Sequence, residues 1–193
     1  KKQFWEDGQN LIIKGMPGSG KTLLTEIAYL SIPQKRADVC RKLLYLLPYR
    51  ALLNEKYDYF LKRYDRMYYR IYHSSSDYSD NDEKIIEGDC DIAIMIYEKL
   101  DNALRVFSDG TQIFYNYDLI VMDEFSLISS LERGSIVNNI LWRYAELPES
   151  EGDRKKARII ALTVPECRTA EYNQLGFLTV SNDTRPVKLY EAI

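Results

Sequence analysis

Short runs of consecutive hydrophobic residues alternate along the chain with longer segments in which hydrophobic residues return every three or four positions. The first pattern is typical of strands buried on both faces of a sheet, and the second is typical of helices. The strand-like runs lie at 10–14, 43–47, 91–96, 119–122 and 158–162. The helix-like segments lie at about 22–30, 50–64, 97–106 and 135–147. Because helices separate consecutive strands, the pattern predicts a doubly wound α/β domain with a mainly parallel sheet and helices on both faces.

Weaker patterns predict a tyrosine-rich strand at 67–72, a polar loop at 74–82 and a charged turn at 149–156. The last residues, 187–193, are strand-like, and position 1 is not methionine, so we expect a fragment of a longer protein. Ligands of doubly wound sheets bind beyond the carboxyl ends of the strands. We therefore expect the functional residues directly after the predicted strands.

Composition narrows the class of protein. The 193 residues, 46% of them hydrophobic, fit one globular domain. No hydrophobic run approaches the length of a membrane span, so we expect no membrane partner. Cys40, Cys90 and Cys167 are too widely spaced for a disulfide framework, which indicates a reducing compartment, cytoplasmic or nuclear. The net charge of -3 provides no global positive field for nucleic acid, so any such binding depends on local cations.

The loop between the first strand and the first helix matches a phosphate-binding motif. Gly15, Gly20, Lys21 and Thr22 satisfy G-x-x-x-x-G-K-[ST], the pattern of P-loop nucleotide-binding proteins. Glycines let the backbone curl so that amide groups point at phosphate oxygens, while Lys21 reaches the β- and γ-phosphates and Thr22 offers a hydroxyl to Mg²⁺. The residues expected around the phosphates are Gly15, Met16, Pro17, Gly18, Ser19, Gly20, Lys21 and Thr22.

Two adjacent carboxylates follow the strand at 119–122. Asp123 suits the Mg²⁺ shell, and Glu124 suits the orientation and activation of the water that attacks the γ-phosphate. A nucleotide kinase would need a lid of arginines and no second acid, whereas a nucleotide hydrolase needs the glutamate. Together with Lys21, the pair favours nucleoside triphosphate hydrolysis.

Several further segments resemble superfamily 2 helicases of the DExH branch, which includes Ski-type RNA helicases, spliceosomal Brr-type helicases and related repair DNA helicases. The resemblance is to the first RecA-like domain of these proteins and spans nearly the whole chain. The segments that carry it are 48–56 (motif Ia), 91–101 (motif Ib), 123–128 with Arg133 and Gly134 (motif II and its loop), 161–165 (motif III) and 185–189. By this resemblance, residues 1–183 form the ATP-binding domain, and 184–193 begin the connection to a second RecA-like domain.

The resemblance also implies which residues contact nucleic acid. Arg50 of motif Ia and Lys99 of motif Ib are expected to hold the phosphate backbone of a single strand, or of a partly duplex substrate. A local basic segment supports phosphate contacts, although charged helix faces are more often plain solvated surface. Its members are Arg50, Lys56, Lys62, Arg63, Arg66 and Arg70. The tyrosines among them could stack on bases, but packing is their more frequent use.

Four positions depart from the family pattern. Motif II ends in Ser126 where the family has His, and motif III begins with Ala161 where the family has Ser, although Thr163 is retained. In the family, these side chains bond to each other and link hydrolysis to movement along the strand. Ile96 stands where motif Ib has Thr, and Ser76 where the preceding loop has Gly. The coupling residues, Ser126 and Thr163, are therefore expected to differ in function from those of the family.

Two functions remain open from the sequence. The first is an ATP-dependent helicase or translocase fragment that uses ATP and Mg²⁺ and needs the second RecA-like domain to supply an arginine, so that the fragment alone hydrolyses almost no ATP. The second is a helicase-derived binding module without productive unwinding. An unrelated P-loop enzyme, such as an AAA-type ATPase or a kinase, is disfavoured by the motif Ia and Ib resemblances.

Overall fold

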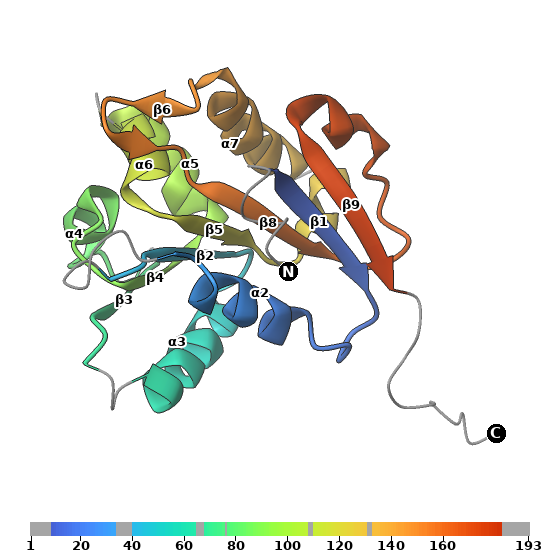
Figure 1. Cartoon of the computed structure of the whole chain (residues 1–193). Coiled ribbons are helices and arrows are strands. Elements are labelled where there is room, and N and C mark those ends of the chain that lie inside the picture. Colours follow the sequence, from blue (N-terminus) through green and yellow to red (C-terminus); the bar gives the residue numbers. More distant parts are fainter. Residues whose placement is uncertain are drawn as a thin grey trace.

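Strands and helices alternate in the structure as the sequence predicts. The computed structural model describes residues 9–33, 40–64, 68–75, 77–107, 110–130 and 133–182. Within these residues, seven strands form one sheet in the order β3-β4-β2-β5-β8-β1-β9, and every neighbouring pair is parallel (Figure 1). These strands are β1 (Asn10–Gly15), β2 (Leu43–Leu47), β3 (Ile71–Ser74), β4 (Ile92–Ile96), β5 (Leu119–Met122), β8 (Arg158–Thr163) and β9 (Phe177–Asn182).

Helices cover both faces of this sheet, which confirms the doubly wound α/β fold (Figure 1). The helices are α2 (Lys21–Leu30), α3 (Arg50–Tyr64), α4 (Asp82–Glu87), α5 (Tyr97–Val106), α6 (Ile113–Asn116) and α7 (Gly134–Glu146), with short 3-10 helices η2 (Gly110–Gln112), η3 (Phe125–Ser129) and η4 (Ala170–Leu175). Tyr29 of α2 and Phe60 of α3 belong to the core on one face. Leu100 of α5 and Ile140 of α7 belong to the core on the other. None of the helices in the described segments is long and hydrophobic enough to cross a membrane.

The consecutive hydrophobic residues of the strands follow from this layering. In β2, Leu44 and Leu46 lie in the core with α5 and α7, whereas Leu43, Tyr45 and Leu47 lie in the core with α2 and α3. All five side chains are at most 1% exposed. Since successive side chains of a strand point to opposite faces, a strand covered on both sides needs a hydrophobic residue at every position. Parallel pairing then brings the carboxyl ends of the strands to one edge, where the predicted site residues follow.

Some elements differ from the prediction. The third strand is Ile71–Ser74 instead of 67–72, and the polar loop after it ends where α4 begins. The charged turn contains a two-stranded antiparallel hairpin of β6 (Ser150–Glu151) and β7 (Arg154–Lys155). The hydrophobic pattern does not predict the four-residue helix α6 or the edge strand β9, in which only Phe177 is buried. The strand expected at 187–193 and the domain boundary expected at 184 lie outside the described residues.

Helix α2 is confirmed, but it turns its hydrophobic side outward. Its large hydrophobic residues are between 44% and 49% exposed, and they are Leu23, Leu24, Ile27 and Leu30. The buried side is polar because neighbouring segments supply partners for it. The Tyr29 hydroxyl donates to the Arg41 carbonyl at 2.8 Å, and the Glu26 carboxylate accepts from the Tyr64 hydroxyl of α3 at 3.0 Å. Hydrophobic spacing thus predicts the helix but not the face that packs on the sheet.

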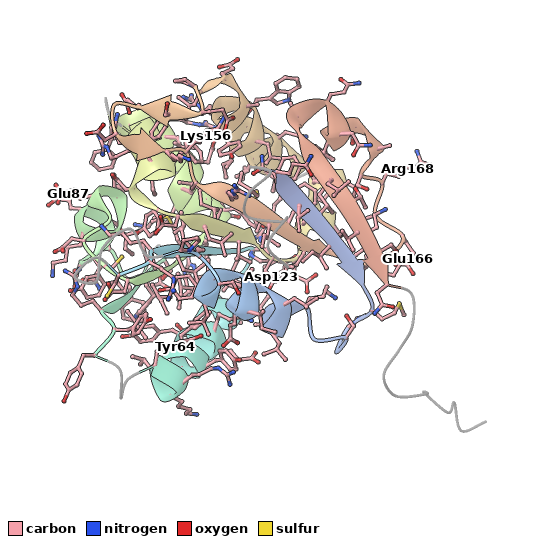
Figure 2. All side chains as sticks on the ribbon, in the orientation of Figure 1. Tyr64, Glu87, Asp123, Lys156, Glu166 and Arg168 are labelled. Atoms are coloured by element: carbon pink, nitrogen blue, oxygen red, sulfur yellow. The ribbon has the colours of Figure 1, made fainter. Side chains whose placement is uncertain are left out.

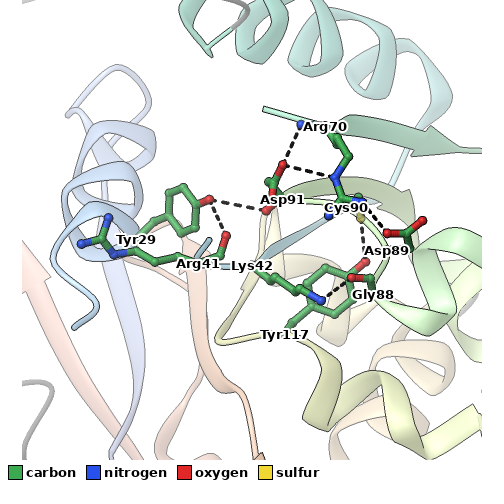
Figure 3. A network of polar contacts seen from close by, with 9 residues as sticks. All are labelled: Tyr29, Arg41, Lys42, Arg70, Gly88, Asp89, Cys90, Asp91 and Tyr117. Carbon is green, nitrogen blue, oxygen red and sulfur yellow. Dashed lines mark hydrogen bonds and ion pairs between the residues drawn. The ribbon is translucent and has the colours of Figure 1, made fainter. Parts of the chain in front are cut away.

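A polar network joins the segments that precede the central strands (Figure 3). The Arg70 amide donates to Asp91 Oδ2 at 2.7 Å, and the Asp91 carbonyl accepts from the Tyr29 hydroxyl at 3.4 Å. Lys42 Nζ donates to a loop carbonyl, that of Gly88, at 2.5 Å. Burial raises the pKa of the Cys90 thiol in this network to about 11, so this cysteine is an unreactive packing residue. The network fixes the amino ends of the strands, leaving the opposite edge for the site.

Candidate nucleotide and nucleic-acid sites

The phosphate-binding motif forms the predicted turn between β1 and α2. Gly18 and Gly20 adopt φ values of 75° and 84°, in the left-handed region that side chains rarely adopt. A Cβ on Gly15 would lie 2.7 Å from Ser19 Oγ, so the loop closes tightly on its own first residue. Gly20 caps α2 without a side-chain hydrogen bond, which leaves the amides of the first helical turn facing the loop. A loop of this shape, with free backbone amides at the start of a helix, is suited to binding phosphate.

Lys21 spans this loop. Its Nζ donates to the Gly15 carbonyl at 2.7 Å and to the Met16 carbonyl at 3.1 Å. The ammonium group therefore lies on the inner side of the loop, where a lysine of this motif reaches phosphate oxygens. The two carbonyl contacts hold Lys21 in place when phosphate does not.

The two carboxylates follow β5 as predicted, and they differ in environment. Asp123 lies at the end of β5, close to α2 (Figure 2), and its Oδ2 accepts from the Tyr45 hydroxyl at 2.6 Å. Its backbone carbonyl accepts from the Tyr97 hydroxyl at 2.7 Å. Glu124 is exposed and has a left-handed φ of 51°. Asp123 is therefore fixed by the fold, whereas the Glu124 carboxylate is open to water.

Both tyrosines beside Asp123 remain neutral hydrogen-bond donors. Burial, and then the charge of Asp123, hold the pKa of Tyr45 well above its usual 10.0. Burial, and then the charges of Asp123 and Glu124, act in the same direction on the pKa of Tyr97. Neither phenol can serve as a general base near neutral pH, whereas the Glu124 carboxylate beside them is exposed to water.

Lys56 of α3 joins these elements, a position that sequence reasoning does not predict. Its Nζ lies 3.4 Å from Thr22 Oγ1 and 3.8 Å from Asp123 Oδ2. The prediction assigns Lys56 to a basic segment with Arg50. Six residues along a helix correspond to a rotation of about 240°, which places the two side chains on different faces. The six-residue spacing of Arg50 and Lys56 is the signal in the sequence that could have predicted their different positions.

Thr22 and Asp123 form a donor set that fits Mg²⁺. Both offer hard oxygen ligands, and Lys56 shows that a cation is accommodated between them. Within the described residues, no three His, Cys, Asp or Glu side chains gather in a way that could hold a metal ion. Mg²⁺ in nucleotide sites takes one or two protein ligands and otherwise phosphate oxygens and waters, so a larger cluster is not needed.

Arg50 and Lys99 come together at the edge formed by the ends of β2 and β4. They line one surface pocket together with Pro48, Tyr49, Ile96, Glu98 and Arg133. Each cation already has a carboxylate partner. Arg50 lies 2.7 Å from Asp77 Oδ2, and Lys99 Nζ lies 2.5 Å from Asp82 Oδ2. Each carboxylate therefore competes with a phosphate group for its own cation.

Arg133 is a third cation in this pocket, and its role is not predicted by the sequence. Its Nη1 donates to the Pro48 carbonyl at 2.6 Å, and its guanidinium lies 4.6 Å from the centre of the Tyr49 ring. Its Nε lies 3.5 Å from Glu98 Oε1. Because it follows motif II in sequence, its position beside motif Ia depends on the turn that precedes α7.

Arg63 and Arg70 of the basic segment do not join this pocket. Arg63 pairs with Glu26 at 2.6 Å, on the side of α2, and Arg70 lies in the network at the opposite edge of the sheet. The Tyr64 hydroxyl donates to Glu26, and the Tyr57 ring packs at a tilt against His73, with ring centres 4.3 Å apart. Arg66 lies outside the described residues. Tyr57 and Tyr64 thus pack within the fold, whereas Tyr68 is 95% exposed.

No hydrogen bond joins the two proposed coupling residues, Ser126 and Thr163. Ser126 is in η3, and Thr163 ends β8 with its Oγ1 buried and without a hydrogen-bond partner. Ala161 is fully buried in the core. Neither Ser126 nor Thr163 forms the bond that the family pattern uses. Ser76 lies outside the described residues.

Comparison with known proteins shows the family to which this chain belongs. The model of the family described as DEAD/DEAH box helicase matches residues 2–164. The ATP-dependent DNA helicase Hel308 of Pyrococcus abyssi is 31% identical over 188 residues, which are 97% of this chain and 24% of that protein. Hel308 of Thermococcus kodakarensis is 32% identical over 97% of this chain and 15% of its own length. Hel308 of Methanococcus vannielii is 29% identical over 100% of this chain and 25% of its own length.

The chain spans a quarter or less of the length of these relatives. The family match nevertheless covers most of this chain and includes the phosphate loop, the Asp123–Glu124 pair and every strand of the parallel sheet except β9. The Ski-type and Brr-type branch is a finer assignment than this match supports. The chain belongs to the DEAD/DEAH box helicase family and has its RecA-like α/β fold.

Proposed function

We propose that the chain is the ATP-binding part of an ATP-dependent DNA helicase or translocase. The observation that carries this proposal is the convergence of Thr22, from the phosphate loop, and Asp123, from the end of β5, on the same ammonium group. Two motifs that are distant in sequence thus form one polyphosphate site. Similarity to proteins named DNA helicases favours DNA as the nucleic acid.

Each residue of the nucleotide site has a distinct role in this proposal. Lys21 exchanges its contacts with the Gly15 and Met16 carbonyls for phosphate oxygens. Thr22 and Asp123 hold Mg²⁺, which when bound neutralises charge on the phosphates. Glu124, exposed beside them, orients the attacking water and accepts its proton. Tyr45 keeps the Asp123 carboxylate in one orientation.

The pocket at the ends of β2 and β4 is the proposed contact with single-stranded DNA. Arg50 and Lys99 bind backbone phosphates after releasing Asp77 and Asp82, and Arg133 adds a third cation. Phosphate contacts of this kind depend little on base sequence and weaken as salt concentration rises. The motif Ia and Ib resemblances support our further proposal that the chain belongs to the Ski/Brr-type branch of its family.

We further propose that a second RecA-like domain completes the enzyme, with residues 1–183 as the first domain and 184–193 as the start of the connection. An arginine from another domain typically accelerates nucleotide hydrolysis by about 10³ to 10⁵. The isolated chain should therefore bind Mg-ATP weakly and hydrolyse almost none. Turnover by the isolated chain at the rate of a complete helicase would refute the two-domain proposal.

The decisive experiment measures ATP hydrolysis by the full-length protein with and without single-stranded DNA. Lys21→Ala should abolish ATP binding, and Glu124→Gln should preserve binding while abolishing hydrolysis. Lys62→Gln, an exposed change on α3, is the matched control and should retain activity. Stimulation by DNA that is lost in both site variants supports the helicase, whereas unaltered hydrolysis in Lys21→Ala contradicts the assigned site.

A second candidate is a binding module derived from a helicase. It is favoured by the Thr163 hydroxyl, which is buried without a partner where the family has a bonded pair. The module binds nucleotide or DNA, but hydrolysis does not respond to DNA. ATPase activity that is the same with and without DNA in the full-length protein would favour this candidate.

A further inference from the structure

Lys56 is built into the nucleotide site instead of lying on the protein surface. Its side chain is 18% exposed, and its ammonium lies 4.9 Å from the centre of the Tyr45 ring. Tyr45 in turn donates to Asp123 Oδ2, the same oxygen that lies 3.8 Å from Lys56 Nζ. Further neighbours of the ammonium are Thr22 Oγ1, at 3.4 Å, and the Tyr59 ring, with its centre at 5.8 Å. The lysine thus faces both proposed metal ligands and is held there by an aromatic ring.

An ammonium group in this place conflicts electrostatically with a divalent cation. Both ions are attracted to Thr22 Oγ1 and Asp123 Oδ2, and two positive ions cannot approach the same oxygens without repulsion. Even with the dielectric constant of water, a unit charge about 6 Å from a divalent ion changes its affinity by about tenfold. Screening inside the site is weaker than in water, so Lys56 must move away when a divalent ion enters.

We propose that Lys56 is a positioning residue that holds Thr22 and Asp123 together in the metal-free protein and withdraws when Mg²⁺ binds. This inference rests on the proposed nucleotide function. Lys56 belongs to α3, whose first residue is Arg50 in the DNA-facing pocket. When Lys56 withdraws on metal binding, the contacts of the helix that begins at this pocket therefore change.

Metal affinity tests the proposal without relying on activity. Mn²⁺ replaces Mg²⁺ as a paramagnetic probe, and its binding in the presence of ADP is measured by electron paramagnetic resonance. Lys56→Gln should bind Mn²⁺ about tenfold more tightly than the wild type, because the competing charge is removed. Lys62→Gln, which removes the same charge from the exposed side of α3, should bind Mn²⁺ as the wild type does. Lys56→Arg keeps the charge and should not gain affinity.

Other outcomes overturn the proposal in distinguishable ways. Unchanged or weaker Mn²⁺ binding by Lys56→Gln refutes the competition, and weaker binding of ADP without metal would make Lys56 a phosphate ligand instead. Failure of the wild type to bind Mn²⁺ and ADP refutes the nucleotide function itself, and this inference with it. If Lys56→Gln does not fold, the Lys56 side-chain NMR signal of the wild type decides, because it must shift when Mg²⁺ and ADP are added. An unshifted signal rejects the proposal.

Discussion

Glu26 is a buried carboxylate on the helix that follows the phosphate loop, and its replacement tests how α2 and α3 are held together. Its side chain is 2% exposed. Its oxygens accept from the Tyr64 hydroxyl at 3.0 Å and from the Tyr59 hydroxyl, and they pair with Arg63 Nε at 2.6 Å. All three partners belong to α3, so Glu26→Ala removes the polar connection between the two helices at the end distant from Arg50.

The expected cost follows from what each partner loses. The Tyr64 side chain is 2% exposed, so its hydroxyl is left without an acceptor in Glu26→Ala, which costs about 1–3 kcal/mol. Tyr59 and Arg63 keep access to water, so their lost contacts add little. We therefore expect the free energy of unfolding to fall by about 1–3 kcal/mol.

Urea denaturation followed by circular dichroism measures this change. Glu55→Ala, which removes an exposed carboxylate from α3, is the control and should remain within about 0.5 kcal/mol of the wild type. If Glu26→Ala is as stable as this control, the buried network does not stabilise the pairing of α2 and α3, and the reasoning from burial is refuted.

Three further predictions concern the loop, the metal site and pH. Gly20→Ala places a side chain at φ 84°, so it should lower stability by about 1–2 kcal/mol and weaken ADP binding in calorimetry; unchanged stability would contradict the strain. Tyr97→Phe leaves the Asp123 carbonyl without its donor and should lower stability by about 1 kcal/mol in urea; an unchanged midpoint would argue against this bond. Burial lowers the pKa of His73 below 6.5, so the folded chain binds this proton less readily than the unfolded chain, and stability should fall as pH drops through about 6.5. His73→Gln should lose less stability between about pH 7 and pH 5 than the wild type, and equal losses would exclude His73 as the cause.

The local structure around the candidate site is predicted well from the sequence. The phosphate loop is specified by its own glycines, two of which have the left-handed φ values that such a turn requires. The strand before Asp123 is specified by four consecutive hydrophobic residues, because it is covered on both faces. Parallel pairing of β1, β5 and β8 then brings the loop and the carboxylates to one edge without further information.

The parts that depend on helix orientation are not predicted. Arg50 and Lys56 belong to one basic segment in sequence, yet the first faces the pocket beyond β2 and β4 and the second faces the nucleotide site. Helix α2 buries Glu26 and Tyr29 because α3 and the segment before β2 supply hydrogen-bond partners. Such partners come from other elements, so the hydrophobic spacing of a single helix carries no information about them.

Helix α3 is the element through which the two candidate sites are physically connected. It begins with Arg50 in the pocket, passes Lys56 beside the proposed metal ligands and ends at Tyr64, which is bonded to Glu26 on the helix of the phosphate loop. The unpartnered Thr163 hydroxyl indicates that this chain lacks the bond between motifs II and III. The chain still has the connection through α3. This connection consists of a partly buried contact of Lys56 at one point and the buried Glu26 carboxylate at another. Helix α3 therefore cannot shift relative to α2 without changing the surroundings of both Thr22 and Glu26. Loss of the family's bond therefore does not by itself separate the candidate nucleotide site from the candidate nucleic-acid pocket.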